Sequence, residues 1–224
     1  MLNEMELMDI HVNVLFKHDT DGRITLINEP PHDDAPRFFI GATKGGTVIR
    51  YHHLLTDHVV KELERAISIG SGTPVAEIIH ILNRVQPIQH VSIGPAFLFP
   101  DVRERSTKAI QITESNKELL LPHFPYTFDE WEYKQPCYAI VQNDRAVSVC
   151  CSARQSAKAA EASLHTIEEY RGKAYGVEVS NGWAAEVQNQ ERLALYSTSW
   201  DNFSSQSVAK KLQLIQYGTD LHIS

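Results

Sequence analysis

The stretch that decides the fold is Arg171-Gly172-Lys173-Ala174-Tyr175-Gly176, a turn built largely from small residues. It follows an alternating run at 160–166 that is typical of a strand, and it opens a run at 175–188 that is typical of a helix. Such a turn leaves several backbone N–H groups unpaired, and the helix dipole adds partial positive charge there. The stretch therefore predicts a phosphate-binding turn, while ordinary capping of a helix start is the alternative interpretation.

The residues after this helix extend the pattern. An apolar run beginning at Leu193 leads into Tyr196-Ser197-Thr198-Ser199-Trp200-Asp201-Asn202, and a second helix-like run spans 204–214. The predicted order is strand, phosphate-type turn, helix, strand, and then an asparagine at a helix start.

This order resembles the GNAT superfamily of N-acetyltransferases. The family's acyl-CoA motif reads Gln/Arg-x-x-Gly-x-Gly/Ala, and Arg171, Ala174 and Gly176 stand at its three marked positions. The family's next motif, Asn-x-x-Ala-x-x-x-Tyr ahead of a Gly-Phe pair, falls on Asn202, Ser205, Ala209, Gln213 and Leu214. The phrase at 196–202 also looks like a little-studied branch with an added N-terminal region.

The resemblance implies an α/β (α+β) fold. A GNAT-like mixed, mostly antiparallel sheet flanked by helices is expected in residues 106–224, preceded by a smaller α+β N-terminal region in 1–105. The implied activity is transfer of an acetyl group from acetyl-CoA to a primary amine, by direct attack in a ternary complex. The acceptor, a small molecule or a peptide amine, is not identified. Two alternatives stay open: a non-catalytic acyl-CoA-binding module, and a different acyl donor or acceptor.

The resemblance also implies which residues hold acetyl-CoA. Backbone groups of Leu164, His165 and Thr166 are expected to pair with the pantetheine arm. The pyrophosphate is expected on the turn, formed by Arg171, Gly172, Lys173, Ala174, Tyr175 and Gly176. Ala174 departs from the family's usual first glycine and narrows the room for a close backbone approach. Asn202 and Ser205 are further cofactor candidates, although asparagine is equally among the best N-caps.

Acyl transfer to an amine needs a base, because a lysine-like amine has a pKa of about 10.4. Period-two alternation places Glu161, Ser163 and His165 on one face of the predicted strand. Family members often carry a carboxylate or a histidine there, so Glu161 is the first candidate for the catalytic base and His165 the second. The alternatives are a solvated strand-end acid for Glu161 and a partly buried structural histidine for His165.

The general acid is a second departure from the family pattern. Its usual tyrosine falls on Ala209, so no acid can be carried over to that position. Tyr196, Tyr217 and Ser197 lie nearby in the sequence, but nothing in their spacing selects one of them.

Composition limits the other classes of function. The chain has 224 residues, 42% of them hydrophobic and 22% charged, which is ordinary for a soluble globular protein. A net charge of −7 argues against a sequence-independent nucleic-acid binder.

No apolar run approaches the roughly 20 residues of a membrane span, and no export leader is recognisable. Three cysteines make no disulfide framework, so a cytoplasmic location is expected. The oligomeric state stays open, with a homodimer the commonest outcome for soluble enzymes.

Local patterns predict the remaining elements. Residues 1–17 fit a helix or a strand, and short strands are expected at 23–28, 37–42 and 47–51. Helices are expected at 56–69, stopped by Gly70-Ser71-Gly72, and from Pro74 to about residue 85 with Thr73 as N-cap. Further along, we expect a strand at 108–113, a short helix at 115–121, a loop at 122–130, and strands at 137–142 and 146–153 around a turn at 143–144.

No metal site is expected. His52 and His53 are adjacent, so on any regular element their side chains diverge, and His58 adds no recognised ligand spacing. Cys150 and Cys151 lie in a predicted strand and would face opposite sides, which suits core packing.

Overall fold

The computed structural model describes residues 2–68 and 72–224. Its strands are β1 (Phe16–His18), β2 (Ile24–Ile27), β3 (Phe38–Thr43), β4 (Gly46–Tyr51), β5 (Val91–Leu98), β6 (Ile110–Gln111), β7 (Cys137–Gln142), β8 (Arg145–Gln155), β9 (Ala159–Thr166), β10 (Leu193–Ser197) and β11 (Ile215–Ile223). Its α-helices are α1 (Glu4–Leu15), α2 (Asp57–Ser68), α3 (Val75–Val85), α4 (Pro125–Asp129), α5 (Tyr175–Asn189) and α6 (Phe203–Leu212), and two 3₁₀ turns span Lys117–Leu120 and Glu168–Tyr170.

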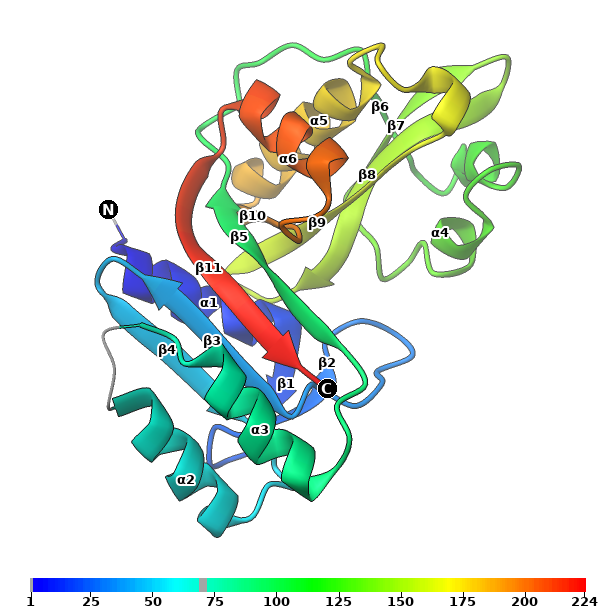
Figure 1. Cartoon of the computed structure of the whole chain (residues 1–224). Helices are drawn as coiled ribbons and strands as arrows, with labels where there is room; N and C mark the ends of the chain where they lie inside the picture. The colour runs from blue at the N-terminus through cyan, green and yellow to red at the C-terminus, as the bar shows by residue number, and fades with distance from the viewer. Residues whose placement is uncertain (1, 69–71) are drawn as a thin grey trace.

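One sheet runs through the whole molecule (Figure 1). Its strand order within the described residues is β4-β3-β11-β5-β10-β9-β8-β7-β6. Within it only β9 and β10 run parallel to each other, and the other neighbours are antiparallel. This confirms the mixed, mostly antiparallel sheet.

The strand β5 occupies the middle of this sheet, although it comes from the first hundred residues. Ala96 is opposite Ser197 of β10 on one side and Gly218 of β11 on the other. The predicted N-terminal and C-terminal regions therefore share a sheet, and the division at residue 105 stays a prediction about separate units.

Helices cover both faces of the sheet. On one face α1 packs over residues such as Leu195 and Tyr217, and on the other α5 and α6 pack over Ala194 and Tyr196. This follows from the alternation of side chains along β10. The largest buried side chain on the α5 face is Trp183, whose Nε1 donates to the hydroxyl of Ser152 at 3.1 Å.

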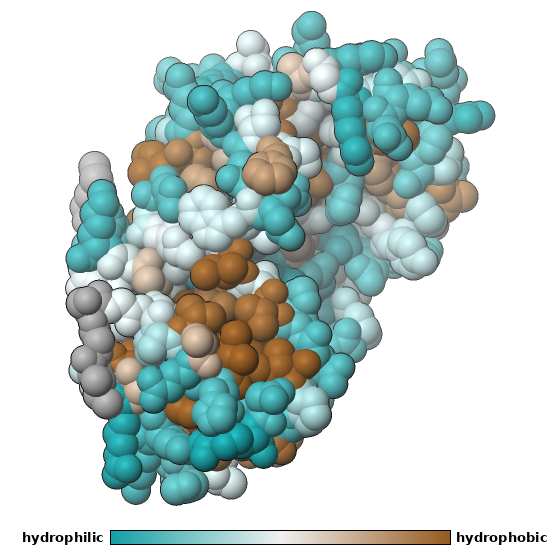
Figure 2. Space-filling model, viewed as in Figure 1, coloured by the Kyte–Doolittle hydropathy of each residue, from teal (hydrophilic) through white to brown (hydrophobic). Residues whose placement is uncertain are grey.

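A third core lies under α2 and α3, where Leu63 and Leu82 are fully buried. This face is only partly covered. Figure 2 shows brown atoms gathered around α3 and the neighbouring strands, where Val85, Val91 and Ile93 are exposed. None of the helices in the described residues has the length and apolar character needed to cross a bilayer.

The predicted elements agree with the structure except at a few places. The first segment resolves as a helix followed by a short strand, with Asn3 and Glu6 forming a capping box. The N-cap of α3 is Pro74 and not Thr73, and it makes no side-chain cap bond. The strand predicted at 108–113 shrinks to Ile110–Gln111. The loop predicted at 122–130 contains α4, because Pro125 stands at a first-turn position that tolerates its missing N–H. The predicted stop at 70–72 lies partly outside the described residues.

Candidate active site

A gap between β9 and β10 forms the centre of the site. The two strands pair only where residues 159–161 meet 193–195. Beyond Ser197 the chain follows β5 instead: the Thr198 N–H donates to the carbonyl of Pro95 at 3.3 Å, and the Trp200 N–H donates to that of Ile93 at 3.1 Å. The two strands therefore diverge, and an opening forms between them.

The register of β9 against β8 shows which backbone groups face this gap. The Ile167 N–H donates to the carbonyl of Val147 at 3.0 Å. Because hydrogen-bonded pairs alternate along an antiparallel ladder, the backbone of His165 also faces β8. The N–H and C=O groups of Leu164 and Thr166 then face the gap. The backbone groups of Leu164 and Thr166 are thus available to a ligand, whereas those of His165 face β8 within the sheet.

The predicted turn lies at one end of the gap. Its five consecutive N–H groups at 172–176 donate no hydrogen bond to any residue that the structure describes. The helix α5 begins at Tyr175, so these donors lie at the positive end of its dipole. Unpaired N–H groups at a helix N-terminus bind anions, phosphate included.

Ala174 affects the turn through its backbone conformation, in addition to the reduced room expected from its methyl group. This N-cap residue has φ 62° and ψ 11°, in the left-handed region, and it makes no side-chain cap bond. A left-handed conformation costs a non-glycine residue roughly 1–2 kcal/mol. The family's glycine would thus relieve backbone strain here as well as making room.

Basic and aromatic side chains surround the turn. Lys173 Nζ lies 4.6 Å from the ring centre of Tyr170, which stacks on Tyr175 at 6.3 Å. Arg171 Nε donates to the carbonyl of Thr166 at 3.4 Å. Two positive charges therefore flank the five free N–H groups.

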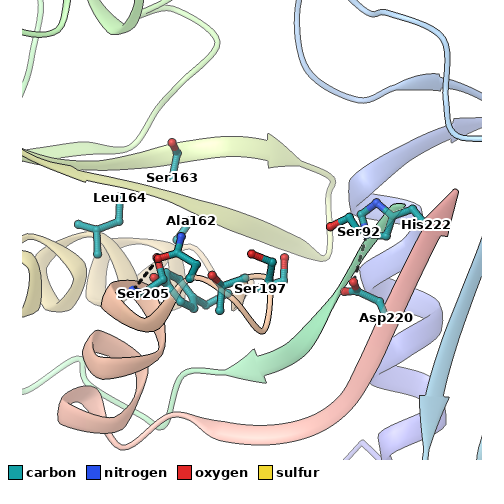
Figure 3. A pocket seen from close by; sticks show the side chains of 12 residues that line it. Ser92, Ala162, Ser163, Leu164, Ser197, Ser205, Asp220 and His222 are labelled. Atoms are coloured by element: carbon teal, nitrogen blue, oxygen red, sulfur yellow. Dashed lines mark hydrogen bonds and ion pairs between the residues drawn. The ribbon is translucent and has the colours of Figure 1, made fainter. Parts of the chain in front are cut away.

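Two pockets meet at the gap. The first, of about 490 Å³, lies between the turn, β9 and α6. The second, of about 320 Å³, lies toward β11 and is lined by Ala162, Ser163, Tyr196, Ser197, Asp220 and His222 among others. They share Leu164, Asn202 and Ser205, so they adjoin each other, and together they are called the groove below. Figure 3 shows Ser197 and Ser205 at one end of the second pocket, and Ser92, Asp220 and His222 at the other.

Asn202 is the N-cap of α6, which is one of the two roles predicted for it; the other is a contact with the cofactor. Its Oδ1 accepts from the Ser205 N–H at 3.1 Å and from the Ser204 hydroxyl at 2.9 Å. Because Asn202 and Ser205 also line both pockets, a contact with the cofactor stays a prediction for each.

The two predicted bases occupy different surroundings. Glu161 is only 4% exposed, and its Oε1 accepts from the Ser197 hydroxyl at 2.6 Å. It does not line the second pocket, whereas Ser197 does. His165 is exposed and lines the first pocket beside the turn. Of the two, only Glu161 adjoins the second pocket, and it reaches that pocket through Ser197.

Sequence reasoning missed a buried polar cluster behind Glu161. His11 of α1 is fully buried, with Nε2 3.5 Å from Glu161 Oε2 and Nδ1 2.8 Å from the Tyr217 hydroxyl. Asp220 lies beside it, 3.9 Å from Nδ1, and also accepts from His222 Nε2 at 3.1 Å. The signal in the sequence was a histidine on the apolar face of a helix and two polar residues at period two in an apolar strand.

Burial and neighbouring charges shift the pKa values of Asp220 and Tyr217 in this cluster. Burial raises the pKa of Asp220, but the hydrogen bond from His222 and the charges of His222 and His11 outweigh it, so the pKa lies below its ordinary value. Burial also raises the pKa of Tyr217 well above its ordinary value, and the charges of Glu161 and Asp220 act in the same direction.

Other candidate residues lie outside the site. His52 Nε2 is 3.3 Å from the carbonyl of Thr25, and its ring packs on that of His53. No group of three potential metal ligands occurs among residues 2–68 and 72–224. Cys150 and Cys151 are buried in cores on opposite faces of the sheet, as their alternation predicts.

No protein-family model matches the chain, and no curated protein matches it. Solved structures do match. A protein from Novosphingobium aromaticivorans described as a GNAT-family acetyltransferase aligns with a TM-score of 0.50 at 14% identity, over 61% of this chain and 65% of that one. A conserved protein of unknown function from Staphylococcus epidermidis aligns with a TM-score of 0.51 at 10% identity, over 80% and 84%. A GCN5-related N-acetyltransferase-like protein from Streptococcus suis aligns with a TM-score of 0.49 at 13% identity, over 66% and 68%.

At these identities the likeness concerns the fold. The chain has the GNAT fold, and the resemblance inferred from the turn and the motif after it is confirmed at that level. The alignment spans just under two thirds of the Novosphingobium protein.

Proposed function

We propose that this protein transfers an acetyl group from acetyl-CoA to a primary amine of a small molecule or peptide, by direct attack in a ternary complex. The fold supports acyl transfer in general, but one fold hosts several functions, so the argument depends on the site. The observation that carries it is the row of free N–H groups at 172–176, joined by one groove to the gap between β9 and β10.

In this proposal the groove holds the cofactor along its length. The pyrophosphate would bind the N–H groups of the turn, with Arg171 and Lys173 supplying positive charge. The pantetheine arm would pair with the gap-facing backbone of Leu164 and Thr166, with α6 on its other side. The thioester would then lie in the second pocket, close to Ser197.

The chemistry at the thioester needs a base, an oxyanion donor and an acid. A backbone N–H of β9 that faces the gap can stabilise the tetrahedral oxyanion. Glu161 remains the predicted base, acting through the Ser197 hydroxyl that it accepts from. His165 stays the second prediction, although it lies on the cofactor side of the groove.

The structure favours Tyr196 as the acid that replaces the family's tyrosine at Ala209. The Tyr217 hydroxyl is 2.8 Å from His11, and that of Ser197 is bonded to Glu161. Tyr196 lines the second pocket, and burial raises its pKa to about 12. It is therefore protonated at neutral pH and can donate to a leaving thiolate.

Tyr196→Phe is expected to lower kcat by about tenfold, which corresponds to one lost hydrogen bond of about 1.4 kcal/mol to a developing charge. Affinity for acetyl-CoA should stay the same, because the ring remains. Thiol release measured beside calorimetric titration separates the two effects. An unchanged kcat would assign thiolate protonation to water.

Calorimetric titration of the wild type with acetyl-CoA and with CoA tests the cofactor site. Micromolar binding is expected, and Arg171→Glu should weaken it by at least tenfold because the charge beside the pyrophosphate is reversed. A screen of primary amines monitored by thiol release then tests turnover. No binding at millimolar cofactor would sink the acetyltransferase proposal.

The alternative is an acyl-CoA-binding module without catalysis. The small side chain of Ala209, where the family has a tyrosine, favours it. It would show tight cofactor binding with no thiol release on any amine.

A further inference from the structure

Two residues of β11 form a dyad at the end of the second pocket. Asp220 and His222 are two positions apart, so their side chains lie on the same face of the strand. The Asp220 side chain is 5% exposed and that of His222 is 24% exposed, and His222 Nε2 lies 3.1 Å from Asp220 Oδ1. Figure 3 shows this bond beside Ser92. The histidine is thus the accessible member, and the carboxylate is the buried one.

The dyad sets the tautomer of His222. An ionised carboxylate can only accept hydrogen bonds, so Nε2 must carry the hydrogen of the 3.1 Å contact. In the neutral imidazole the other nitrogen, Nδ1, then holds a free lone pair. Nδ1 has no hydrogen-bond partner among the described residues.

Charged and polar groups from several elements surround the buried side of the dyad. Behind Asp220, His11 of α1 lies between Asp220 Oδ2 at 3.9 Å and Glu161 Oε2 at 3.5 Å. Both of these oxygens are buried, and neither has a hydrogen-bond partner in the described part of the chain. Arg154 of β8 contributes an opposing positive charge near Asp220. Asp220 is thus the carboxylate that contacts His222, and Glu161 lies beyond it, on the other side of His11.

We propose that Nδ1 of His222 takes the proton of the acceptor amine, and that Asp220 is the positioning residue that orients it. The inference rests on the proposed acetyl transfer. The amine nitrogen forms the C–N bond with the thioester carbonyl carbon, its proton passes to Nδ1, and the C–S bond breaks to release thiolate, which Tyr196 or water protonates. His222 then replaces Glu161 as the base, and Glu161 holds Ser197 and His11 behind the pocket. The acceptor enters from the β11 side, opposite the cofactor turn.

The kinetic test compares three variants with a control. His222→Gln is expected to lower kcat about 100-fold, within the range for loss of a general base. The KM for acetyl-CoA should not change, and the acidic limb of the pH–rate profile should flatten. Asp220→Asn should lower kcat by at least tenfold, because the tautomer is no longer imposed. Glu161→Gln should have a smaller effect than His222→Gln. His123→Gln, at an exposed position that lines neither pocket, should match the wild type.

Two outcomes would overturn the inference while leaving the proposed function intact. One is a wild-type kcat in His222→Gln, and the other is a larger loss in Glu161→Gln than in His222→Gln. A wild type that does not bind acetyl-CoA would overturn the proposed function and this inference together.

The tautomer provides a second readout that needs no turnover. In a ¹⁵N correlation spectrum of the imidazoles, His222 is expected as the Nε2–H form in the wild type. In Asp220→Asn the two tautomers should mix. An Nδ1–H form in the wild type would contradict the geometry and remove the proposed base.

Discussion

Gly176→Trp is expected to weaken acetyl-CoA binding by at least 100-fold. A Cβ at Gly176 would meet Leu164 Cδ2 and Val208 Cγ2 at 3.6 Å and Thr166 Oγ1 at 3.7 Å, so this position faces the groove between β9 and α6. An indole there fills the space beside the turn and separates the phosphates from the free N–H groups. Charge-assisted hydrogen bonds contribute about 1.5–3 kcal/mol each, so losing one or two reaches this magnitude. Calorimetric titration measures the loss.

Gly176→Ala is the matched control. The same contacts of 3.6–3.7 Å are ordinary van der Waals distances for a methyl group. The alanine variant should bind acetyl-CoA within about twofold of the wild type. A thermal melt of both variants establishes that each is folded. If the tryptophan variant is folded and binds normally, the cofactor does not occupy this groove.

Gly94→Ala is expected to destabilise the fold and to distort the second pocket. A Cβ at Gly94 would lie 1.7 Å from the carbonyl oxygen of Thr198 and 2.7 Å from Ser199 Cα, and both are backbone atoms. The segment at 198–202 must therefore shift. Overpacking of this kind costs roughly 1–3 kcal/mol in the free energy of unfolding. The shift also moves Asn202, so acetyl-CoA binding should weaken. Denaturant unfolding and calorimetric titration measure the two effects.

Gly72→Ala serves as the control for this substitution. No atom of residues 2–68 or 72–224 lies within 4 Å of a Cβ at Gly72. Its free energy of unfolding should stay within about 0.5 kcal/mol of the wild type. Equal stability of the two variants would show that the 198–202 segment moves aside freely, and that β5 does not hold it.

Local signals were enough to predict the elements around the turn at 171–176. The alternation at 160–166, the small residues of the turn and the helix spacing after it each act within a few residues, and β9, α5, β10 and α6 all form where they predict. The capping role of Asn202 was likewise readable, because a cap depends only on the three residues that follow.

The second pocket and the buried polar cluster behind it depend on contacts between distant parts of the chain. His11 and Tyr217 meet across 206 positions, and no local pattern relates them. The place of β5 between β10 and β11 is also not predictable from the sequence pattern, because the pattern carries no information on which strands pair. Glu161, the base predicted from strand alternation, lies on β9 where this strand pairs with β10, and it does not line the second pocket. The residues that separate it from the pocket came from other strands.

The central position of β5 has a consequence for the order in which the molecule is made. β5 leaves the ribosome well before its two neighbours in the sheet, β10 and β11, because both follow it at a distance in the sequence. Its two edges cannot pair with these neighbours until β10 and β11 have been made, and open strand edges are where chains aggregate. His11 likewise meets Asp220 only after β11 has been made. The nascent chain therefore completes its sheet and its buried polar cluster in the same late step.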